Sequence, residues 1–279
     1  MKVLDLFSGI GGFSLGLERA GMETVAFCEI EDYPRKVLAK HWPDVPCYGD
    51  VRTLTKERLD NDGVGSIDVI CGGFPCQDIS VAGRQAGLGE ETRSGLWSEC
   101  ARLLGEIRPS YAIFENVTAL LSGDNGQWFQ RVLWDISQVG YDAEWHCIPA
   151  SHLGAQHIRD RVWIVAHSNG NRPQGGDNEP SEANGAGGAP QGGSPGRASS
   201  EGAASDTECW QQKLEVYSSR IRRENKVSRD GYWETLSEPF VCRRTHGIPG
   251  RAHRLKGLGN AVCPQIPEII GRAIMQLEP

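Results

Sequence analysis

A cysteine that follows an apolar run and two glycines is the first candidate for chemistry in this chain. Residues 67–71 read Ile-Asp-Val-Ile-Cys, and two glycines, Gly72 and Gly73, follow shortly before Pro75 and Cys76. This pattern predicts a buried strand that ends in a loop, with glycines free to turn the chain and to admit a ligand close to the backbone. Open α/β sheets bind ligands beyond the carboxyl ends of their strands, so Cys76 is a candidate nucleophile. The alternative is an inert buried thiol, which is the commoner kind of free cysteine.

A second glycine-rich turn follows the first apolar run of the chain. Residues 3–7 predict a strand, and Ser-Gly-Ile-Gly-Gly at 8–12 predicts a turn before a helix at 13–20. This is the first half of a nucleotide-binding βα unit, although its glycine spacing is not the G-x-G-x-x-G of dinucleotide sites. A second predicted strand ends in Glu29, where an acid can accept hydrogen bonds from ribose hydroxyls. The alternative for Glu29 is a carboxylate that merely precedes a helix.

Strands and helices continue to alternate after this unit. Helices are predicted at 32–42, 94–107 and 126–139, and strands at 24–28, 48–51, 67–71, 111–114, 143–148 and 162–166. The alternation predicts an α/β fold with a doubly wound, mostly parallel sheet, and the last two strands are expected to form an antiparallel hairpin at its edge. Asp50 and Glu115 stand near the ends of two of these strands, and Arg159 and Arg161 lie beside the last one.

Composition places the chain among ordinary soluble proteins. Of its 279 residues, 39% are hydrophobic and 23% are charged. No apolar run approaches the ~20 residues that a membrane span needs, and Asp5 stands where a signal peptide would carry its apolar core. Nine cysteines without a paired C-x-x-C spacing indicate neither a disulfide framework nor a zinc site. We therefore expect a reduced, cytoplasmic protein without a bound metal.

Charge and composition change sharply along the chain. The net charge is −7, with 13 Lys and Arg against 22 Asp and Glu in residues 1–150, and 11 against 5 in residues 209–256. A basic segment on an acidic body is compatible with local phosphate contact rather than with a general nucleic-acid coat. Residues 168–208 contain no Val, Ile, Leu, Met, Phe, Trp, Tyr or Cys, so they are expected to be disordered.

Five short stretches occur in an order that points to one protein family. They are Asp-Leu-Phe-Ser-Gly-Ile-Gly-Gly-Phe at 5–13, Gly-Phe-Pro-Cys-Gln at 73–77, Phe-Glu-Asn-Val at 114–117, Arg-Asp-Arg at 159–161 and Gly-Asn-Ala-Val at 259–262. With these stretches the chain resembles the DNA (cytosine-5) methyltransferases, particularly the compact bacterial and phage type. The resemblance implies a Rossmann-like methyltransferase fold with a small target-recognition region. It divides the chain into a catalytic and cofactor-binding domain at 1–167, a low-complexity run at 168–208, a target-recognition region at 209–246 and a return to the catalytic domain at 247–279.

The resemblance also implies a catalytic set. Cys76 matches the nucleophile that adds to C6 of a cytosine flipped out of double-stranded DNA. Glu115 matches the carboxyl group that hydrogen-bonds N3 and the 4-amino group, which requires an acid held partly protonated. Arg161 matches the contact to O2 of the base, and Arg159 matches the arginine that orders the nucleophile loop. A capping acid before a loop is the alternative for Glu115, and a salt-bridged surface residue is the alternative for either arginine.

The methyl donor that the resemblance implies is S-adenosylmethionine. Twelve positions match cofactor contacts of the family: Phe7, Gly9, Gly11, Gly12, Glu29, Ile30, Asp50, Val51, Pro75, Leu96, Asn260 and Ala261. Within this set Glu29 matches the ribose-binding acid, and Asp50 matches the acid near the adenine amino group. The closing helix, residues 264–277, would return beside the first strand and complete the cofactor site.

DNA recognition is expected in the variable region of the family, here residues 209–246. The candidates for DNA contact lie in this region and on the nucleophile loop: Gln77, Ser80, Arg220, Arg222, Arg223, Arg229, Arg243 and Arg244. The alternative for the arginines from 220 to 229 is a solvated helix face. A monomer is expected, and any cognate restriction endonuclease would act as a separate protein.

One motif departs from the family pattern, and three other functions are alternatives. The family usually reads Gln-x-Arg-x-Arg before the last core strand, whereas His157 stands here at the position of the glutamine. An RNA cytosine methyltransferase is the rival enzyme, although the Cys-Phe-Thr signature usual in RNA-acting members is absent from the sequence. A catalytically inactive DNA-binding homologue has no chemical reason to keep Cys76, Glu115 and both arginines. A Rossmann dehydrogenase would leave Cys76 without a role.

Overall fold

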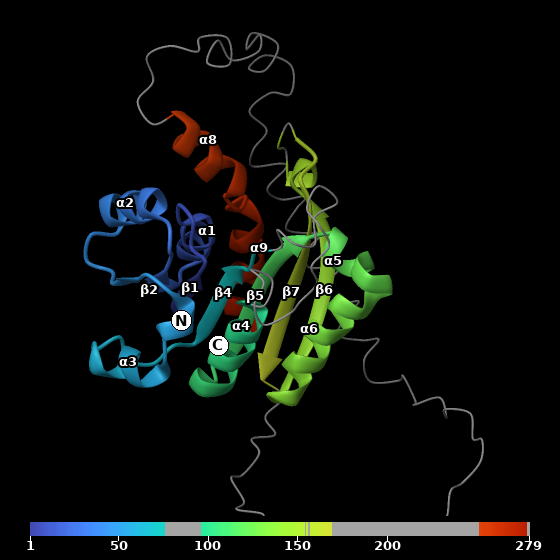
Figure 1. The fold of residues 1–279 in the computed structure, drawn as a ribbon, viewed down its shortest axis with the longest axis horizontal. Helices are drawn as coiled ribbons and strands as arrows, with labels where there is room; N and C mark the ends of the chain where they lie inside the picture. Colours follow the sequence, from blue (N-terminus) through green and yellow to red (C-terminus); the bar gives the residue numbers. More distant parts are fainter. Residues whose placement is uncertain (76–95, 154, 156, 169–250, 278–279) are drawn as a thin grey trace, which may run out of the picture.

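A seven-stranded sheet forms the centre of the computed structural model, which describes residues 1–75, 96–153, 155, 157–168 and 251–277. The strands are β1 (Lys2–Leu6), β2 (Glu23–Cys28), β3 (Cys47–Tyr48), β4 (Val69–Gly73), β5 (Tyr111–Val117), β6 (Tyr141–Pro149) and β7 (Asp160–Ser168). Their order across the sheet is β3-β2-β1-β4-β5-β7-β6 (Figure 1). Strands β1 to β5 are parallel, and β7 is antiparallel to both β5 and β6. The predicted α/β fold and the predicted hairpin at the sheet edge are therefore confirmed.

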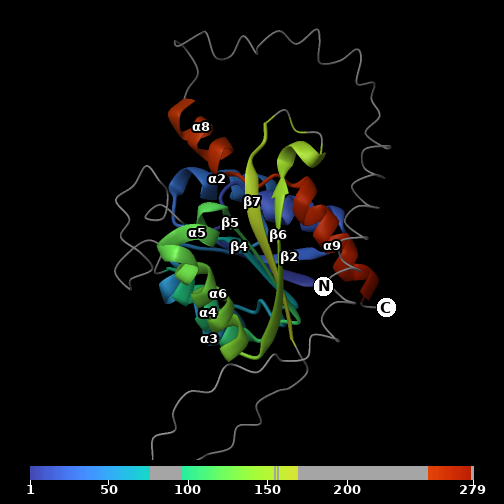
Figure 2. The same cartoon turned by 90° about the vertical axis from the view of Figure 1, so that its right-hand side faces the viewer.

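Helices cover both faces of this sheet (Figure 2). One face carries α1 (Gly12–Arg19) and α9 (Gln265–Leu277), and the other carries α4 (Leu96–Ile107) and α6 (Gln127–Gln138). Further helices lie at the margins: α2 (Asp32–His41), α3 (Lys56–Asn61), α5 (Ala119–Ser122) and α8 (Arg251–Asn260). Within the described residues, no helix is long and apolar enough to cross a lipid bilayer.

The helices that can be predicted from the sequence are those whose apolar residues recur at helical spacing. In α4, Trp97, Cys100, Leu103 and Leu104 recur at helical spacing and are buried. The same period predicts α6 and the closing helix α9, whereas α3 and α5, with six and four residues, are too short for a period to be recognised. Neither of these two helices is predicted from the sequence, and α8, whose described leucines are exposed, is not predicted either.

The two glycines before the Pro-Cys pair lie inside β4 and not in a turn after it. Neither has a positive φ, so the expectation that they turn the chain is wrong. A Cβ on Gly72 would lie 2.6 Å from the carbonyl oxygen of Leu6, and a Cβ on Gly73 would lie 3.1 Å from Glu115 Oε2. These glycines therefore allow β1 and the Glu115 carboxylate to approach β4 closely.

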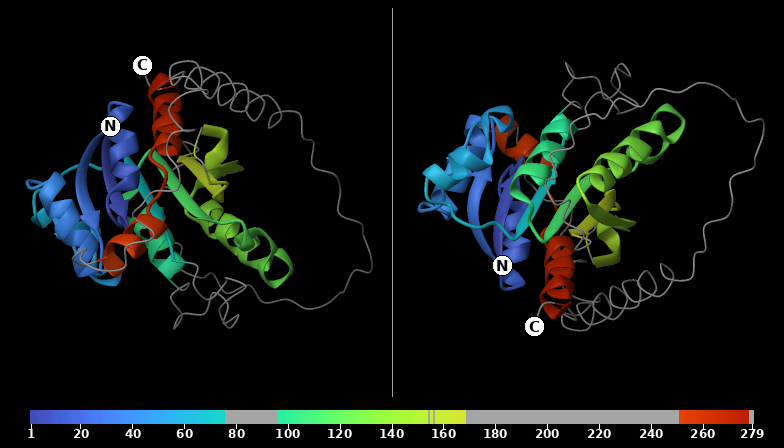
Figure 3. Two further views of the ribbon diagram at one scale, coloured as in Figure 1. Left: turned by 90° about the horizontal axis from the view of Figure 1, so that it is seen from above. Right: turned by 90° about the horizontal axis from the view of Figure 1, so that it is seen from below.

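The closing helix α9 lies against α1, on the same side of the sheet (Figure 3). A Cβ on Gly16 of α1 would lie 2.7 Å from Pro267 Cγ and would also collide with the carbonyl oxygen of Pro264. Buried Ile266, Ile269 and Ile270 join Val3 of β1 in one apolar core. The last helix thus returns to the first βα unit, and glycine at position 16 permits the close packing.

We predict that Gly16→Ala destabilises the protein while Gly105→Ala does not. Both glycines lie inside helices, so both gain up to about 1 kcal/mol of helix propensity from the methyl group. At Gly16 this gain is outweighed by overpacking against Pro267, which costs about 1–3 kcal/mol. At Gly105 the nearest atom, Val139 Cγ1, lies 3.4 Å away, at ordinary contact distance. Urea unfolding measures both, and equal changes in free energy would contradict the tight α1–α9 contact.

Candidate functional site

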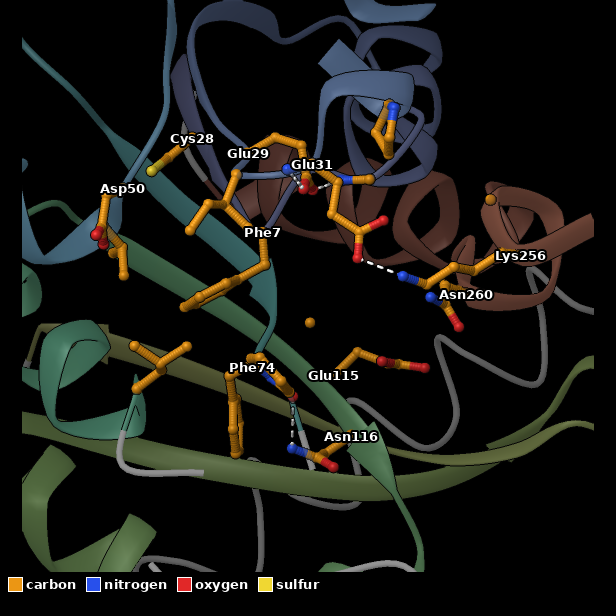
Figure 4. A pocket seen from close by; sticks show the side chains of 18 of the residues that line it. Phe7, Cys28, Glu29, Glu31, Asp50, Phe74, Glu115, Asn116, Lys256 and Asn260 are labelled. Atoms are coloured by element: carbon orange, nitrogen blue, oxygen red, sulfur yellow. Dashed lines mark hydrogen bonds and ion pairs between the residues drawn. The ribbon is translucent and has the colours of Figure 1, made fainter. Parts of the chain in front are cut away.

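A cavity of about 840 Å³ opens at the carboxyl ends of β1, β2, β4 and β5. The chain order reverses between β1 and β4, and such a switch point is where open α/β sheets bind ligands. Twelve of the predicted site residues line it: Phe7, Gly9, Glu29, Ile30, Asp50, Val51, Pro75, Leu96, Glu115, Arg159, Arg161 and Asn260. Figure 4 shows Glu29 and Glu31 at the top of the cavity and Glu115 and Asn116 at the bottom.

The glycine-rich turn after β1 presents its backbone to this cavity. Phe7 has a φ of 52°, which is uncommon for a residue with a side chain, and Gly9 has a φ of 54°. The turn is closed by hydrogen bonds from the Gly11 amide to the Ser8 carbonyl (2.9 Å) and from the Ser8 amide to the Cys28 carbonyl (3.1 Å). A Cβ on Gly9 would meet no atom within 4 Å, so this position leaves open space beside the backbone.

Glu29 ties this turn to the start of α2. Its Oε2 accepts a hydrogen bond from the Gly9 amide at 2.7 Å, and its Oε1 accepts one from the Glu31 amide at 2.8 Å. The side chain is buried, and each carboxylate oxygen keeps a further lone pair. Because Glu31 is the N-cap residue of α2, the role of Glu29 extends beyond preceding a helix.

Asp50 and its neighbours form the wall near β3. Val51 begins the short 3-10 helix η1 (Val51–Thr53), and Asp50 caps it by accepting a hydrogen bond from the Arg52 amide at 3.0 Å. The Arg52 side chain also donates to both Asp50 oxygens, which lowers the pKa of Asp50. The predicted strand at 48–51 is correspondingly shorter, because β3 ends at Tyr48.

Glu115 faces the cavity from inside β5. Its position within the strand, four residues after Tyr111, excludes the alternative of a capping acid in a loop. Burial raises the pKa of Glu115, and the charges of Arg161 and Arg159 oppose that rise. Arg161 Nε lies 3.0 Å from Glu115 Oε1. The site therefore holds a carboxyl group that keeps its proton to higher pH than a free glutamate does.

Arg159 contacts the end of α8. Its Nη1 donates to the Gly259 carbonyl at 2.7 Å, and its Nη2 donates to the Asn260 carbonyl at 3.4 Å. These contacts place Arg159 and Asn260 together in the cavity wall. The proposed link from Arg159 to the nucleophile loop involves residues outside the described part of the chain.

Three predicted cofactor residues lie outside the cavity wall. A Cβ on Gly11 would lie 2.6 Å from the Trp42 ring, and a Cβ on Gly12 would lie 2.7 Å from the Val262 carbonyl oxygen. The Ala261 amide donates to the Gly257 carbonyl at 3.0 Å. In this structure these residues shape the backbone around the site, since none of them lines the cavity itself.

Comparisons with known proteins agree with this geometry. A model of the C-5 cytosine-specific DNA methylase family matches residues 1–233. The chain belongs to this family. The Type II methyltransferase M.NgoBI of Neisseria gonorrhoeae is 34% identical over 167 residues, which are 60% of this chain and 50% of that protein. M.Eco47II of Escherichia coli is 38% identical over 169 residues, 60% of this chain and 39% of that protein.

A solved structure shares the fold of this chain. It is described as a DNA modification methyltransferase encoded within an E. coli prophage, and it matches with a TM-score of 0.52 and 29% identity. The match covers 60% of this chain and 47% of that chain. This chain therefore spans half or less of the length of these relatives.

Two buried polar residues, Asn116 in the cavity wall and Asp5 on β1, have no role predicted from the sequence. Asn116 is buried and donates from Nδ2 to the Phe74 carbonyl at 3.1 Å, which holds the segment that ends at Pro75. Asp5 is fully buried below the glycine turn, accepts a hydrogen bond from Ser14 Oγ at 2.8 Å, and has its pKa raised by burial to about 7. An amide or an acid inside a buried strand is the signal that could have found both.

Several predicted site residues lie outside the described part of the chain. They are Cys76, Gln77, Ser80, Arg220, Arg222, Arg223, Arg229, Arg243 and Arg244. The target-recognition region at 209–246 lies there too, as does the low-complexity run except for Ser168, which ends β7. His157 is described and is exposed. The roles of these residues stay predictions.

We predict that Glu29→Gln destabilises the protein in the absence of any ligand. A glutamine offers one acceptor oxygen, so its amide group would face the N–H of Gly9 or Glu31 and leave that donor unsatisfied. The expected loss is about 1–3 kcal/mol of unfolding free energy, measured by urea titration. The matched control is Glu31→Gln, which breaks only an exposed ion pair with Lys256 and should cost at most about 1 kcal/mol. Equal losses would show that Glu29 does not hold the turn.

Proposed function

We propose that this chain transfers a methyl group from S-adenosylmethionine to C5 of a cytosine flipped out of double-stranded DNA, through a covalent bond between Cys76 and C6. One observation carries the proposal. A single cavity is lined on one side by the glycine turn and Glu29 and on another by the buried Glu115. Pro75, which directly precedes Cys76 in the sequence, also lines this cavity. Donor, carboxyl group and nucleophile can therefore meet in one place.

The residues of the described wall fit S-adenosylmethionine. Gly9 leaves open space beside the backbone, and the free lone pairs of Glu29 can accept hydrogen bonds from ribose hydroxyls. Apolar Ile30, Val51 and Leu96 offer a surface for the adenine ring. When bound, S-adenosylmethionine supplies an activated methyl group.

Glu115 carries the proton chemistry of the proposed reaction. The Cys76 thiolate uses an electron pair to form the S–C6 bond, and charge moves from the C5=C6 bond toward N3. The protonated Glu115 donates at N3, which stabilises the developing charge and makes C5 nucleophilic. Arg161, whose Nε lies 3.0 Å from Glu115 Oε1, is the proposed hydrogen-bond donor to O2 of the same base. After methylation the C5 proton passes to solvent, the electron pair of the C5–H bond restores the C5=C6 bond, and the S–C6 pair returns to sulfur as the Cys76 thiolate. The proton at N3 returns to Glu115.

DNA is the proposed substrate, although RNA is the alternative. The relatives M.NgoBI and M.Eco47II are named Type II methyltransferases, and another relative is an orphan methyltransferase of Bacillus phage rho11s. These names support DNA modification. We propose a monomer that reads its target through residues 209–246, with any cognate endonuclease acting separately.

We predict that Cys76→Ala abolishes methyl transfer to DNA and leaves cofactor binding intact, because it removes only the covalent step. Transfer of tritiated methyl groups to DNA and to tRNA measures the reaction, and tRNA should remain unlabelled. The wild type should also form a denaturation-resistant adduct with 5-fluorocytosine DNA, since fluorine blocks the elimination that frees the enzyme. An active preparation without such an adduct would falsify the role of Cys76.

We predict that Glu115→Gln lowers the rate by roughly 10²-fold or more, the usual contribution of a general acid. Because burial raises the pKa of Glu115, the wild-type rate should persist above the pH at which a free glutamate is ionised, and fall as pH rises through the raised pKa. The variant should lack this fall. Glu57→Gln on α3 is the control and should retain the wild-type profile. An unchanged rate in Glu115→Gln would reassign Glu115 to a structural role.

A further inference from the structure

Arg159 joins two parts of the cavity wall that are far apart in the sequence. Its guanidinium donates to the carbonyls of Gly259 and Asn260, at 2.7 and 3.4 Å. Both carbonyls lie at the C-terminal end of α8, where helix carbonyls lack partners within the helix. A cation at this end also complements the helix dipole. Arg159 therefore anchors the end of α8 by hydrogen bonds and by charge.

The backbone of Arg159 is constrained as well. Its φ is 33°, uncommon for a residue with a side chain, and its carbonyl accepts a hydrogen bond from the Ala150 amide at 3.3 Å. Such conformations persist only where surrounding contacts determine them. This constraint fixes where the long side chain starts, so that it reaches both α8 and the neighbourhood of Glu115.

The charge of Arg159 also acts on Glu115. It opposes, after Arg161, the rise that burial causes in the pKa of Glu115. Burial and the nearby charge of Arg161 in turn lower the pKa of Arg159. Two guanidinium groups and one carboxylate therefore share the Glu115 end of the cavity.

Few other described contacts hold α8. Leu255 and Leu258 are 54% and 65% exposed. An exposed ion pair joins Lys256 to Glu31 of the α2 N-cap at 2.6 Å (Figure 4), and the His253 ring stacks on Tyr33 with centroids 6.0 Å apart. Exposed ion pairs contribute only about 0–1 kcal/mol. The placement of Asn260 in the wall thus depends strongly on Arg159.

We infer that Arg159 is a positioning residue that couples the cofactor side of the cavity to Glu115. By holding the end of α8 it keeps Asn260 in the wall, and its positive charge lies in the same cavity wall as the Glu115 carboxyl group. The inference rests on the proposed function for the identity of the cofactor and of the base. The inferred role of Arg159 in cofactor binding does not require bound DNA.

The test compares Arg159→Met, Arg159→Lys and the control Arg272→Met. Arg272 also donates to a backbone carbonyl, that of Arg19 at 3.1 Å, but lies on α9 outside the cavity wall. Binding of S-adenosylhomocysteine without DNA is measured by calorimetry, and methyl transfer is measured against pH. Circular dichroism and urea unfolding check that each variant folds.

Arg159→Met should bind S-adenosylhomocysteine about tenfold more weakly, since it loses two charge-assisted hydrogen bonds. Its rate should also fall at higher pH than in the wild type, because Glu115 loses a neighbouring cation and its pKa rises further. In Arg159→Lys the rate of methyl transfer should fall at the same pH as in the wild type, because the positive charge remains. This variant should still bind S-adenosylhomocysteine more weakly, because a lysine lacks the forked guanidinium that reaches both carbonyls. Arg272→Met should match the wild type in both measurements.

The outcomes separate this inference from the proposed function. A wild type that does not bind S-adenosylhomocysteine overturns the proposed function and this inference with it. A wild type that binds while Arg159→Met binds equally well overturns the inference alone. Weaker binding without a shift in the pH limb would reduce Arg159 to a structural contact and also overturns the coupling. If Arg159→Met does not fold, Arg159→Gln replaces it, and either unchanged binding of S-adenosylhomocysteine or an unshifted pH dependence in that variant overturns the inference.

Discussion

Two carboxylates, Glu29 and Glu115, are buried on different sides of one cavity, and a buried charge without partners costs several kcal/mol. The chain compensates them in different ways. Glu29 accepts hydrogen bonds from two backbone amides, which hold it as part of the turn. Glu115 meets a guanidinium instead, and burial still raises its pKa. One carboxylate is thus a structural anchor, and the other is left with a proton to exchange.

The glycines of β4 leave room for the buried side chain of Glu115. Because Gly72 lets β1 approach closely and Gly73 leaves room for the Glu115 carboxylate, β4 can lie between β1 and β5 with a charged side chain across its end. A side chain at position 73 would push Glu115 toward Arg161 or out of the sheet. The same stretch then continues into Pro75, held by Asn116 through the Phe74 carbonyl. Packing between neighbouring strands therefore determines where the segment before Cys76 begins.

Local sequence patterns predicted the elements of this fold, but not how distant residues pair. The apolar periods of α4 and α9 and the order of strands and glycines were sufficient for the sheet and its edge hairpin. Most of the residues that gather at the switch point were predicted only through the resemblance of short motifs to a known family. The contact of Arg159 with Gly259 spans 100 residues, and that of Lys256 with Glu31 spans 225, so no local period encodes either. The position of Gly72 and Gly73 within the strand was missed for a related reason: their function concerns the neighbouring strand and not their own backbone.

The ion pairs in the described part of the cavity wall also indicate where a negatively charged polymer would be attracted. Asp50 pairs with Arg52, Glu31 with Lys256, and Glu99 with Arg102, so each of these acids is balanced by a cation nearby. The Glu115 end differs, because Arg159 and Arg161 together face a single carboxylate. When Glu115 is protonated, it neutralises the charge of neither Arg159 nor Arg161. On a body that is acidic through residues 1–150, this end of the cavity therefore carries two cations beside one carboxyl group, and such a site would attract the phosphates of the proposed DNA substrate.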